Sequence, residues 1–291
     1  MIDLHTHILP GIDDGARDLA AALAMADAFA SCGVELVACT PHILPGLYHN
    51  NGPDIRLAVN NLQAEIDRAG IPLVLTTGAD VHLAPDLIEG LRMGTVLTIA
   101  DSRYLLLEPP HHLMPARFEE AVFDLQAAGY IPIITHPERL SWIRNHYDVL
   151  QRLSARGALM QITSGSVTGK FGRSALYWSE RMLDEGLVDI LASDAHDTET
   201  RRPDLAEGLA AVAKRLGLEE ATAMVAGRPL GIVENLAPEL LPRVRSKGVH
   251  GTLRAGPEVN ERRGTEDART RSSARVSDAL HRIGRRLRKL F

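Results

Sequence analysis

Short apolar segments alternate with longer helix-forming segments over most of this chain. From Leu4 to about Gly227 the order strand, helix, strand, helix recurs about seven times. Such alternation predicts a parallel sheet with crossover helices, and about seven repeats favour a closed or distorted barrel over an open sheet. After a first strand at the N-terminus, the expected strands are 34–40, 73–77, 104–108, 131–135, 159–162 and 189–192, and the expected helices are 17–31, 54–69, 116–128, 147–156, 174–185 and 204–216.

The carboxyl ends of these strands carry histidines and carboxylates. His5 and His7 end the first strand, and residues two apart in a strand point to the same face, so one ion can bind both imidazoles. Each such side chain alone has an ordinary structural explanation, but six of the seven strand ends carry one, and barrel enzymes build their active sites at this end. The strand that ends at Ile162 offers Thr163 and Ser164 instead. The set is His5, His7, His42, Asp80, His82, Glu108, His136, Asp194 and His196, with Asp14 in the loop after the first strand.

Imidazoles mixed with carboxylates, and no thiolates, are typical of sites for Mn, Fe, Zn or Mg. The donors exceed the need of one ion, so we expect two or three ions that clamp a phosphoryl oxygen and lower the pKa of a bound water. Arg139 and Arg201 follow His136 and His196 closely and could bind phosphate oxygens; the alternative is that both form surface ion pairs.

The two cysteines, Cys32 and Cys39, are expected to be small apolar core residues. A cysteine-dependent phosphatase loop needs an arginine six positions after the nucleophile, and Ala38 and Pro45 stand there instead. The sequence therefore argues against a thiolate mechanism.

The charge is distributed unevenly. Residues 243–291 hold fourteen Lys and Arg against five Asp and Glu, a charge of +9, which leaves −14 on residues 1–242 of a chain whose net charge is −5. The segment 243–275 is poor in large apolar residues and is expected to be disordered. In residues 276–291 apolar side chains recur every three or four positions among Arg and Lys. This pattern predicts either an amphipathic basic helix on an anionic membrane surface or a solvated basic tail.

The sequence contains no long apolar run of the kind that spans a membrane, and its N-terminus does not resemble a secretory signal. A cytoplasmic location is expected, peripheral at the inner face of the membrane if the basic segment binds lipid. No nucleic-acid partner is expected.

Seven sequence blocks, in consistent order over about residues 1–240, resemble the PHP-superfamily tyrosine phosphatases of bacterial polysaccharide loci, the CpsB/YwqE type. The first block, His5-Thr-His-Ile-Leu-Pro-Gly-Ile-Asp-Asp-Gly15, is the longest. The others are Thr40-Pro-His42, Gly78-Ala-Asp80, Asp101-Ser-Arg-Tyr-Leu-Leu-Leu-Glu108, His136-Pro-Glu-Arg139, Gln161-Ile-Thr-Ser-Gly-Ser166 and Ser193-Asp-Ala-His196.

This resemblance implies a distorted (β/α)7 barrel, the PHP fold, over residues 1–242. It implies a trinuclear and usually manganese-dependent site, for which Fe, Zn, Mg and Co are the alternatives, and in-line attack of metal-bound hydroxide on phosphotyrosine of a bacterial autokinase that controls capsule or exopolysaccharide export. By matched position, His5, His7 and Asp194 would hold one ion, Glu108 and His136 a second, and Asp14, His42 and His196 a third, with Arg139 and Arg201 on the phosphate.

One position departs from the family pattern. Asp80 stands where the family has a bridging glutamate, and the missing methylene withdraws the carboxylate by about 1.5 Å. Altered metal preference or reduced activity is therefore expected at this position. No general acid is evident in the sequence. The alternatives are a small-molecule phosphoesterase of the same superfamily, of the histidinol-phosphate type, and a non-catalytic barrel that binds a phosphoprotein.

Overall fold

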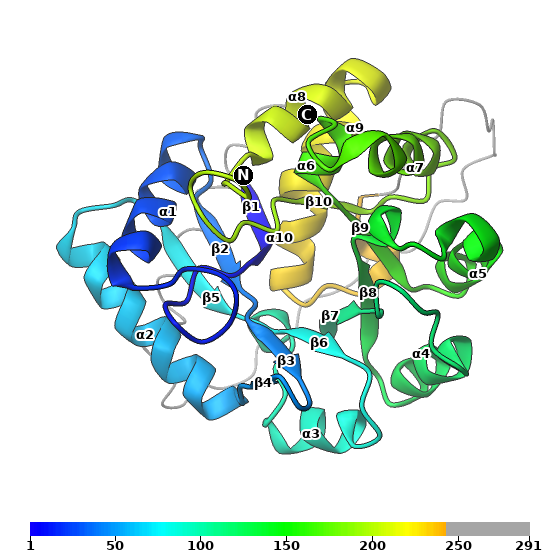
Figure 1. Ribbon diagram of the computed structural model, residues 1–291, viewed down its shortest axis with the longest axis horizontal. Helices are drawn as coiled ribbons and strands as arrows, with labels where there is room; N and C mark the ends of the chain where they lie inside the picture. The colour runs from blue at the N-terminus through cyan, green and yellow to red at the C-terminus, as the bar shows by residue number, and fades with distance from the viewer. Residues whose placement is uncertain (243–291) are drawn as a thin grey trace, which may run out of the picture.

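The structure is a computed structural model, and it describes residues 1–242. The segments 243–275 and 276–291, for which disorder and a basic helix are expected, lie outside the described residues. In the described part, a ring of strands is surrounded by helices (Figure 1). The strands are β1 (Ile2–Thr6), β2 (Leu36–Cys39), β3 (His42–Leu44), β4 (Tyr48–His49), β5 (Val74–Thr77), β6 (Asp80–His82), β7 (Tyr104–Glu108), β8 (Ile131–Thr135), β9 (Leu159–Thr163) and β10 (Ile190–Ala192).

Helices cover the outside of this ring in chain order, as Figure 1 shows. All six helices expected from the sequence are present, with ends shifted by a few residues, and short helices that were not expected add to them. The helices are α1 (Leu19–Ser31), α2 (Gly52–Arg68), α3 (Leu87–Met93), α4 (Phe118–Ala127), α5 (Ile143–Ala155), α6 (Ser164–Val167), α7 (Gly172–Asp184), α8 (Leu205–Leu216), α9 (Leu218–Thr222) and α10 (Arg228–Val233).

Two of the seven barrel strands are broken in the middle. β2 pairs in parallel with β5, and β3, which follows β2 after Pro41, pairs in parallel with β6, which follows β5 after Gly78. Proline has no N–H to donate to a neighbouring strand. A Cβ on Gly78 would stand 2.9 Å from the Thr40 side chain, so glycine lets the two strands approach at the bend. These breaks divide the ring into two sheets, of order β1-β2-β5 and β10-β9-β8-β7-β6-β3-β4.

The first and last strands close the ring. An isolated parallel bridge joins Thr6 to Ala195, the Asp194 N–H donates to the His5 carbonyl at 3.0 Å, and the His7 N–H donates to the Ala195 carbonyl at 2.9 Å. The structure is thus a distorted parallel barrel, which confirms the fold expected from the alternation. Its closure brings the carboxyl end of β1 next to the segment after β10.

The apolar core has two parts because alternate strand residues face opposite sides of the sheet. The outer part packs the strands against the surrounding helices. The inner part contains Ile2, Leu4, Leu106 and Ile190, together with Ile232 of α10. Helix α10, drawn in gold in Figure 1, crosses the centre of the ring. Its side chains pack against Ile2 and Ile190, the first residues of β1 and β10, at the end of the barrel away from the polar strand ends.

Candidate metal centre

The loop after β1 fixes the two histidines of the first strand. Asp13 accepts a hydrogen bond from Nδ1 of His7 at 2.7 Å and others from the backbone N–H groups of Gly15 and His42. A Cβ on Gly15 would stand 2.0 Å from the His7 carbonyl oxygen, so only glycine allows this close return of the loop. Gln161 Oε1 of β9 lies 2.8 Å from Nδ1 of His5. Both rings therefore direct Nε2 toward the centre of the barrel mouth.

Asp14, His42 and His196 form one group at the mouth. Asp14 Oδ1 lies 3.5 Å from His42 Nε2 and 3.4 Å from His196 Nε2. The Nδ1 of His196 donates to the Asp194 carbonyl at 2.9 Å. With His7, these side chains offer four donor atoms that lie within 4.8 Å of one another. The group that the resemblance assigns to the third ion is thus assembled in the structure.

Asp80 and Asp194 face the β1 histidines from two sides. His5 Nε2 lies 3.4 Å from Asp80 Oδ2 and 3.4 Å from Asp194 Oδ1, and 3.3 Å from His7 Nε2. Asp80 Oδ2 also lies 3.5 Å from Nδ1 of His42. Despite its shorter side chain, Asp80 therefore reaches the space between His5 and His42.

Four imidazoles surround Glu108 at the end of β7. Oε2 lies 3.3 Å from His42 Nδ1 and 2.6 Å from His82 Nε2. Oε1 lies 3.2 Å from His111 Nε2 and 3.5 Å from His136 Nε2. Burial opposes ionisation of Glu108, but the close approach of His111, His42 and His82 outweighs it and holds the pKa of this carboxyl far below its usual range.

These distances fit shared metal ions. Two donors that bind one ion at about 2.1 Å lie roughly 3.0–3.5 Å apart, which matches most of the imidazole–carboxylate separations above. Several of the donor atoms are buried and make no hydrogen bond, a costly arrangement without a ligand. These atoms are His42 Nδ1, both carboxylate oxygens of Asp80, Glu108 Oε2, Asp194 Oδ1 and His196 Nε2.

Two imidazoles of the cluster are held in the neutral form that binds metal. Burial and the neighbouring charge of Arg139 hold the pKa of His136 well below its usual value, and burial together with the charge of His7 lowers the pKa of His196 to about 4. Both imidazoles are therefore neutral near pH 7, with lone pairs free for an ion. Burial alone would lower the pKa of His7, but the carboxylate of Asp13 raises it to about 10. Metal uptake at His7 must then release a proton.

Two site residues adopt left-handed backbone conformations. His136 has φ +34° and Asp194 has φ +54°, and strain of this kind in residues other than glycine collects at functional sites. The pKa of Asp194 lies well below its usual range, because His5 and Arg201 outweigh the effect of burial. His136 directly follows β8 and Asp194 is the second residue after β10, so the strained turns aim their side chains into the mouth.

Arg139 and Arg201 meet beside this cluster. Each donates to Asp194 Oδ2 at 2.6 Å. Arg202, which is adjacent in sequence, pairs instead with Glu207 on the surface. The structure therefore places Arg201, and not Arg202, at the barrel mouth. The ring of Phe171 lies 4.5 Å from the Arg139 guanidinium carbon.

All ten strand-end and loop residues expected from the sequence lie at the same mouth of the barrel, together with both arginines. Sequence reasoning missed Asp13, His111 and Gln161, which contact His7, Glu108 and His5. Asp13 and Gln161 lie inside the sequence blocks of the resemblance, so both could have been named as candidate site residues from the sequence. His111 follows two prolines in a loop, with no periodicity to mark it.

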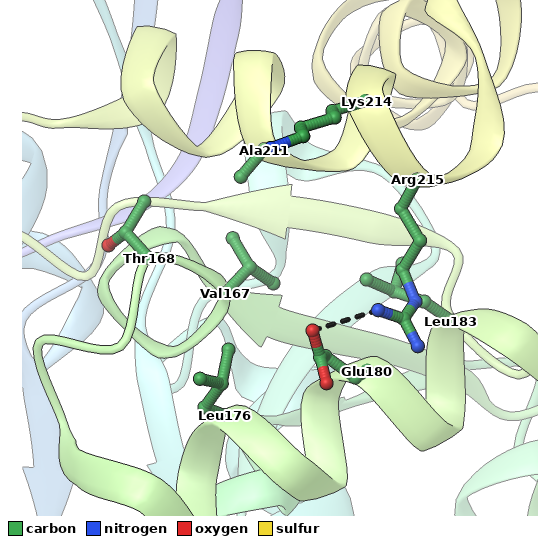
Figure 2. A pocket seen from close by; sticks show the side chains of 8 residues that line it. All are labelled: Val167, Thr168, Leu176, Glu180, Leu183, Ala211, Lys214 and Arg215. Atoms are coloured by element: carbon green, nitrogen blue, oxygen red, sulfur yellow. Dashed lines mark ion pairs between the residues drawn. The ribbon is translucent and has the colours of Figure 1, made fainter.

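A separate groove lies between α7 and α8 (Figure 2). Its lining mixes apolar and charged side chains and carries an ion pair between Glu180 and Arg215 at 2.8 Å. Its lining contains none of the candidate metal donors and neither of the two mouth arginines. The lining residues are Val167, Thr168, Leu176, Glu180, Leu183, Ala211, Lys214 and Arg215.

The fold and the donor set define the class of protein: a distorted parallel (β/α)7 barrel with a histidine- and carboxylate-rich centre at the carboxyl ends of its strands. Residues 1–234 match the model of the family described as "Capsular polysaccharide synthesis, CpsB/CapC". The chain belongs to this family.

Named relatives agree with this assignment. The chain is 37% identical over 219 residues to the tyrosine-protein phosphatase YwqE of Bacillus subtilis. This alignment covers 75% of the chain and 86% of the relative. It is 36% identical over 203 residues to the putative tyrosine-protein phosphatase CapC of Staphylococcus aureus. This alignment covers 70% of the chain and 79% of the relative.

A solved structure extends the comparison to the fold. It comes from work on YwqE of Bacillus subtilis and CpsB of Streptococcus pneumoniae, described there as unique metal-dependent tyrosine phosphatases. The TM-score is 0.78 at 35% identity, and the match covers 81% of this chain and 96% of the solved one. Within residues 1–242 no helix has the length and apolar character needed to cross a bilayer.

Proposed function

We propose that this protein is a manganese-dependent protein-tyrosine phosphatase whose substrate is an autophosphorylating tyrosine kinase of capsule or exopolysaccharide synthesis. One observation carries the proposal: the imidazole and carboxylate cluster lies directly beside two arginines that converge on Asp194 Oδ2. A set of metal donors next to paired guanidinium groups suits a phosphate ester, because both can neutralise charge on phosphoryl oxygens.

The chain's own residues would divide the work. His5, His7 and Asp194, Glu108 and His136, and Asp14, His42 and His196 would hold ions, with Asp80 between the first and third groups. Bound divalent ions supply Lewis acidity and a water of lowered pKa. Arg139 and Arg201 would orient the phosphoryl group by donating N–H bonds to its oxygens. Phenolate, with a parent pKa of about 10, is a tolerable leaving group.

The relatives support the tyrosine substrate and the biological setting. YwqE and CpsB are named tyrosine-protein phosphatases, and the family description names capsular polysaccharide synthesis. A phosphotyrosine substrate in that setting points to a kinase partner. Manganese is our choice because the resemblance implies it, whereas the imidazole and carboxylate donors alone suit Fe, Zn and Mg as well.

Substrate and metal can be tested together. Metal-stripped protein would be given Mn, Mg, Zn, Fe or Co and assayed on a phosphotyrosine peptide, a phosphoserine peptide and histidinol phosphate. We expect turnover that is restored by metal and selective for phosphotyrosine, and that is lost in His136→Ala. Preferential hydrolysis of histidinol phosphate would replace the proposal with a small-molecule phosphoesterase. Stoichiometric peptide binding without turnover under any metal would indicate a binding barrel.

We further propose that residues 1–242 form the phosphatase domain of a cytoplasmic protein and that the basic segment 276–291 brings it to the inner face of the membrane. The support is the charge of +9 on residues 243–291 and the apolar spacing near the end of the chain. A chain cut after Pro242 should keep its activity on a soluble phosphopeptide but no longer sediment with anionic vesicles. Full-length protein that ignores such vesicles would end this proposal.

A further inference from the structure

The ion position around Glu108 and His136 has fewer donors than its neighbours. Asp80, which stands at the family's bridging position, reaches His5 and His42 at 3.4 and 3.5 Å. His42 also faces Asp14 through its other nitrogen, and a neutral imidazole has only one lone pair to offer an ion. If His42 serves the group of Asp14, the position on Glu108 Oε1 is left with Glu108 and His136 alone.

His111 stands at this gap. Its Nε2 lies 3.2 Å from Glu108 Oε1, the same oxygen that faces His136 Nε2 at 3.5 Å. The donor atoms of Glu108, His111 and His136 all lie within 4.8 Å of one another, and the two rings are tilted with centroids 5.0 Å apart. The separations match those of donors that share one ion. His82, in contrast, lies 2.6 Å from the opposite oxygen, which is too close for two ligands of one ion.

The loop that carries His111 is held firmly in place. Ser141 donates to the His111 carbonyl through both its backbone N–H, at 2.9 Å, and its hydroxyl, at 3.0 Å. Trp142 Nε1 donates to the Pro110 carbonyl at 2.9 Å. Pro109 and Pro110 further restrict the backbone. These contacts fix the backbone that presents the imidazole to Glu108, as a binding site requires.

We propose that His111 is a metal ligand that completes, with Glu108 and His136, a three-residue position for a borderline divalent ion such as Zn²⁺ or Fe²⁺. Two imidazoles and one carboxylate leave a position open for water or substrate, and they favour such ions over the harder Mg²⁺. This inference rests on the proposed metal centre, but it concerns metal binding and can be tested without a substrate.

The test uses the full-length chain, stripped of metal and titrated separately with Zn²⁺ and Mn²⁺ against a chromophoric chelator. His111→Gln is compared with the unchanged protein and with His112→Gln, since His112 is the exposed histidine next in sequence. We expect His111→Gln to weaken Zn²⁺ binding at one position about tenfold or more, and X-ray absorption of the Zn²⁺ form to show fewer imidazoles per ion. His112→Gln should match the unchanged protein in both measurements.

Glutamine separates ligation from positioning. Its amide can still donate a hydrogen bond to Glu108 but cannot replace an imidazole on the ion. If His111 only orients Glu108, His111→Gln keeps its Zn²⁺ affinity and imidazole count, and that result overturns the proposal. A second variant, His111→Asp, should regain an ion while its preference shifts from Zn²⁺ toward Mn²⁺. If the metal-binding results are as expected but the protein does not hydrolyse phosphotyrosine, the proposed function is contradicted and the assignment of His111 as a ligand is not.

Discussion

Arg139 and Arg201 donate to the same oxygen, Oδ2 of Asp194, each at 2.6 Å, although they come from loops after different barrel strands. Their two positive charges are brought together by one carboxylate. The oxygens of a phosphoryl group in the mouth could accept further hydrogen bonds from both arginines, in addition to those that Asp194 accepts. The pair is therefore poised beside the donor cluster before substrate binds.

Replacing Arg139 by Lys should lower kcat/KM for a phosphotyrosine peptide by about 100-fold, because lysine keeps the charge but loses the planar fork that binds two oxygens at once. Steady-state kinetics with metal in excess would measure the loss. Arg202→Lys is the matched control, since Arg202 pairs with Glu207 on the surface and should leave kcat/KM unchanged. Equal kinetics for the two variants would remove Arg139 from the phosphate site.

Gly165→Ala should disturb Arg139 without touching a metal donor. The added Cβ would stand 2.6 Å from Cε2 of Phe171, whose ring packs against the Arg139 guanidinium. Loss of that cation–π contact, worth about 0.5–2 kcal/mol, should reduce kcat/KM between about 2-fold and 30-fold. Metal content by elemental analysis should be unchanged, and Gly227→Ala, at a helical glycine in contact with Pro242, should behave like the unchanged protein. A Gly165→Ala protein with depleted metal would point to wider damage instead.

Asp80→Asn should weaken metal binding about tenfold or more, because it removes a charge from a side chain whose two buried oxygens have no hydrogen-bond donor in the described structure. Chelator competition with Mn²⁺ measures the change. Asp80→Glu should bring no gain in kcat/KM, since the shorter carboxylate already approaches His5 and His42. A clear gain from glutamate would instead support the expectation that Asp80 limits activity.

Asp189→Asn should stabilise the protein more at neutral pH than at acid pH. Burial raises the pKa of Asp189 to about 6 from a usual 3.8, so the folded state binds an extra proton between these values and stability falls as pH rises through them. The charged carboxylate then costs roughly 1–3 kcal/mol above pH 6. The asparagine carbonyl can still accept from the Met160 N–H, as Oδ2 does now at 2.9 Å.

Thermal melts at pH 4.5 and pH 7.5 test this expectation. The gain in melting temperature should be clearly larger at pH 7.5 than at pH 4.5, and Asp86→Asn, at an exposed carboxylate, should show no gain at either. Equal shifts at both pH values would rule out titration of Asp189 as the cause.

The sequence predicted the barrel because its strands are buried apolar runs separated by amphipathic helices. Both kinds of element can be recognised from the local spacing of apolar residues. It did not reveal the breaks at Pro41 and Gly78. At these two residues the predicted strands bend and continue as β3 and β6. The contact of Gly78 with Thr40 at the bend is fixed only by tertiary packing. Helix α10 was also missed. It is too short to show a clear spacing of apolar residues. Its position depends on tertiary packing against the inner part of the core.

The site was predictable to the extent that donors stand at strand ends. Parallel strands bring those ends together, so His5, Glu108 and Asp194 could be placed at one mouth from sequence alone. Asp13 could not be told apart from Asp14 by spacing, and only the structure shows that one holds His7 while the other faces His42 and His196. His111 depended on the path of a loop, which follows from its contacts with Ser141 and Trp142.

The bridge between Thr6 and Ala195 joins residues 189 positions apart in the chain. A growing polypeptide displays His5 and His7 from the outset, but their carboxylate companion Asp194 emerges from the ribosome only near the end of the barrel. A metal site that used Asp194 would therefore lack this carboxylate until the last strand is in place. Closure of the ring, and not the first strand alone, completes the candidate centre.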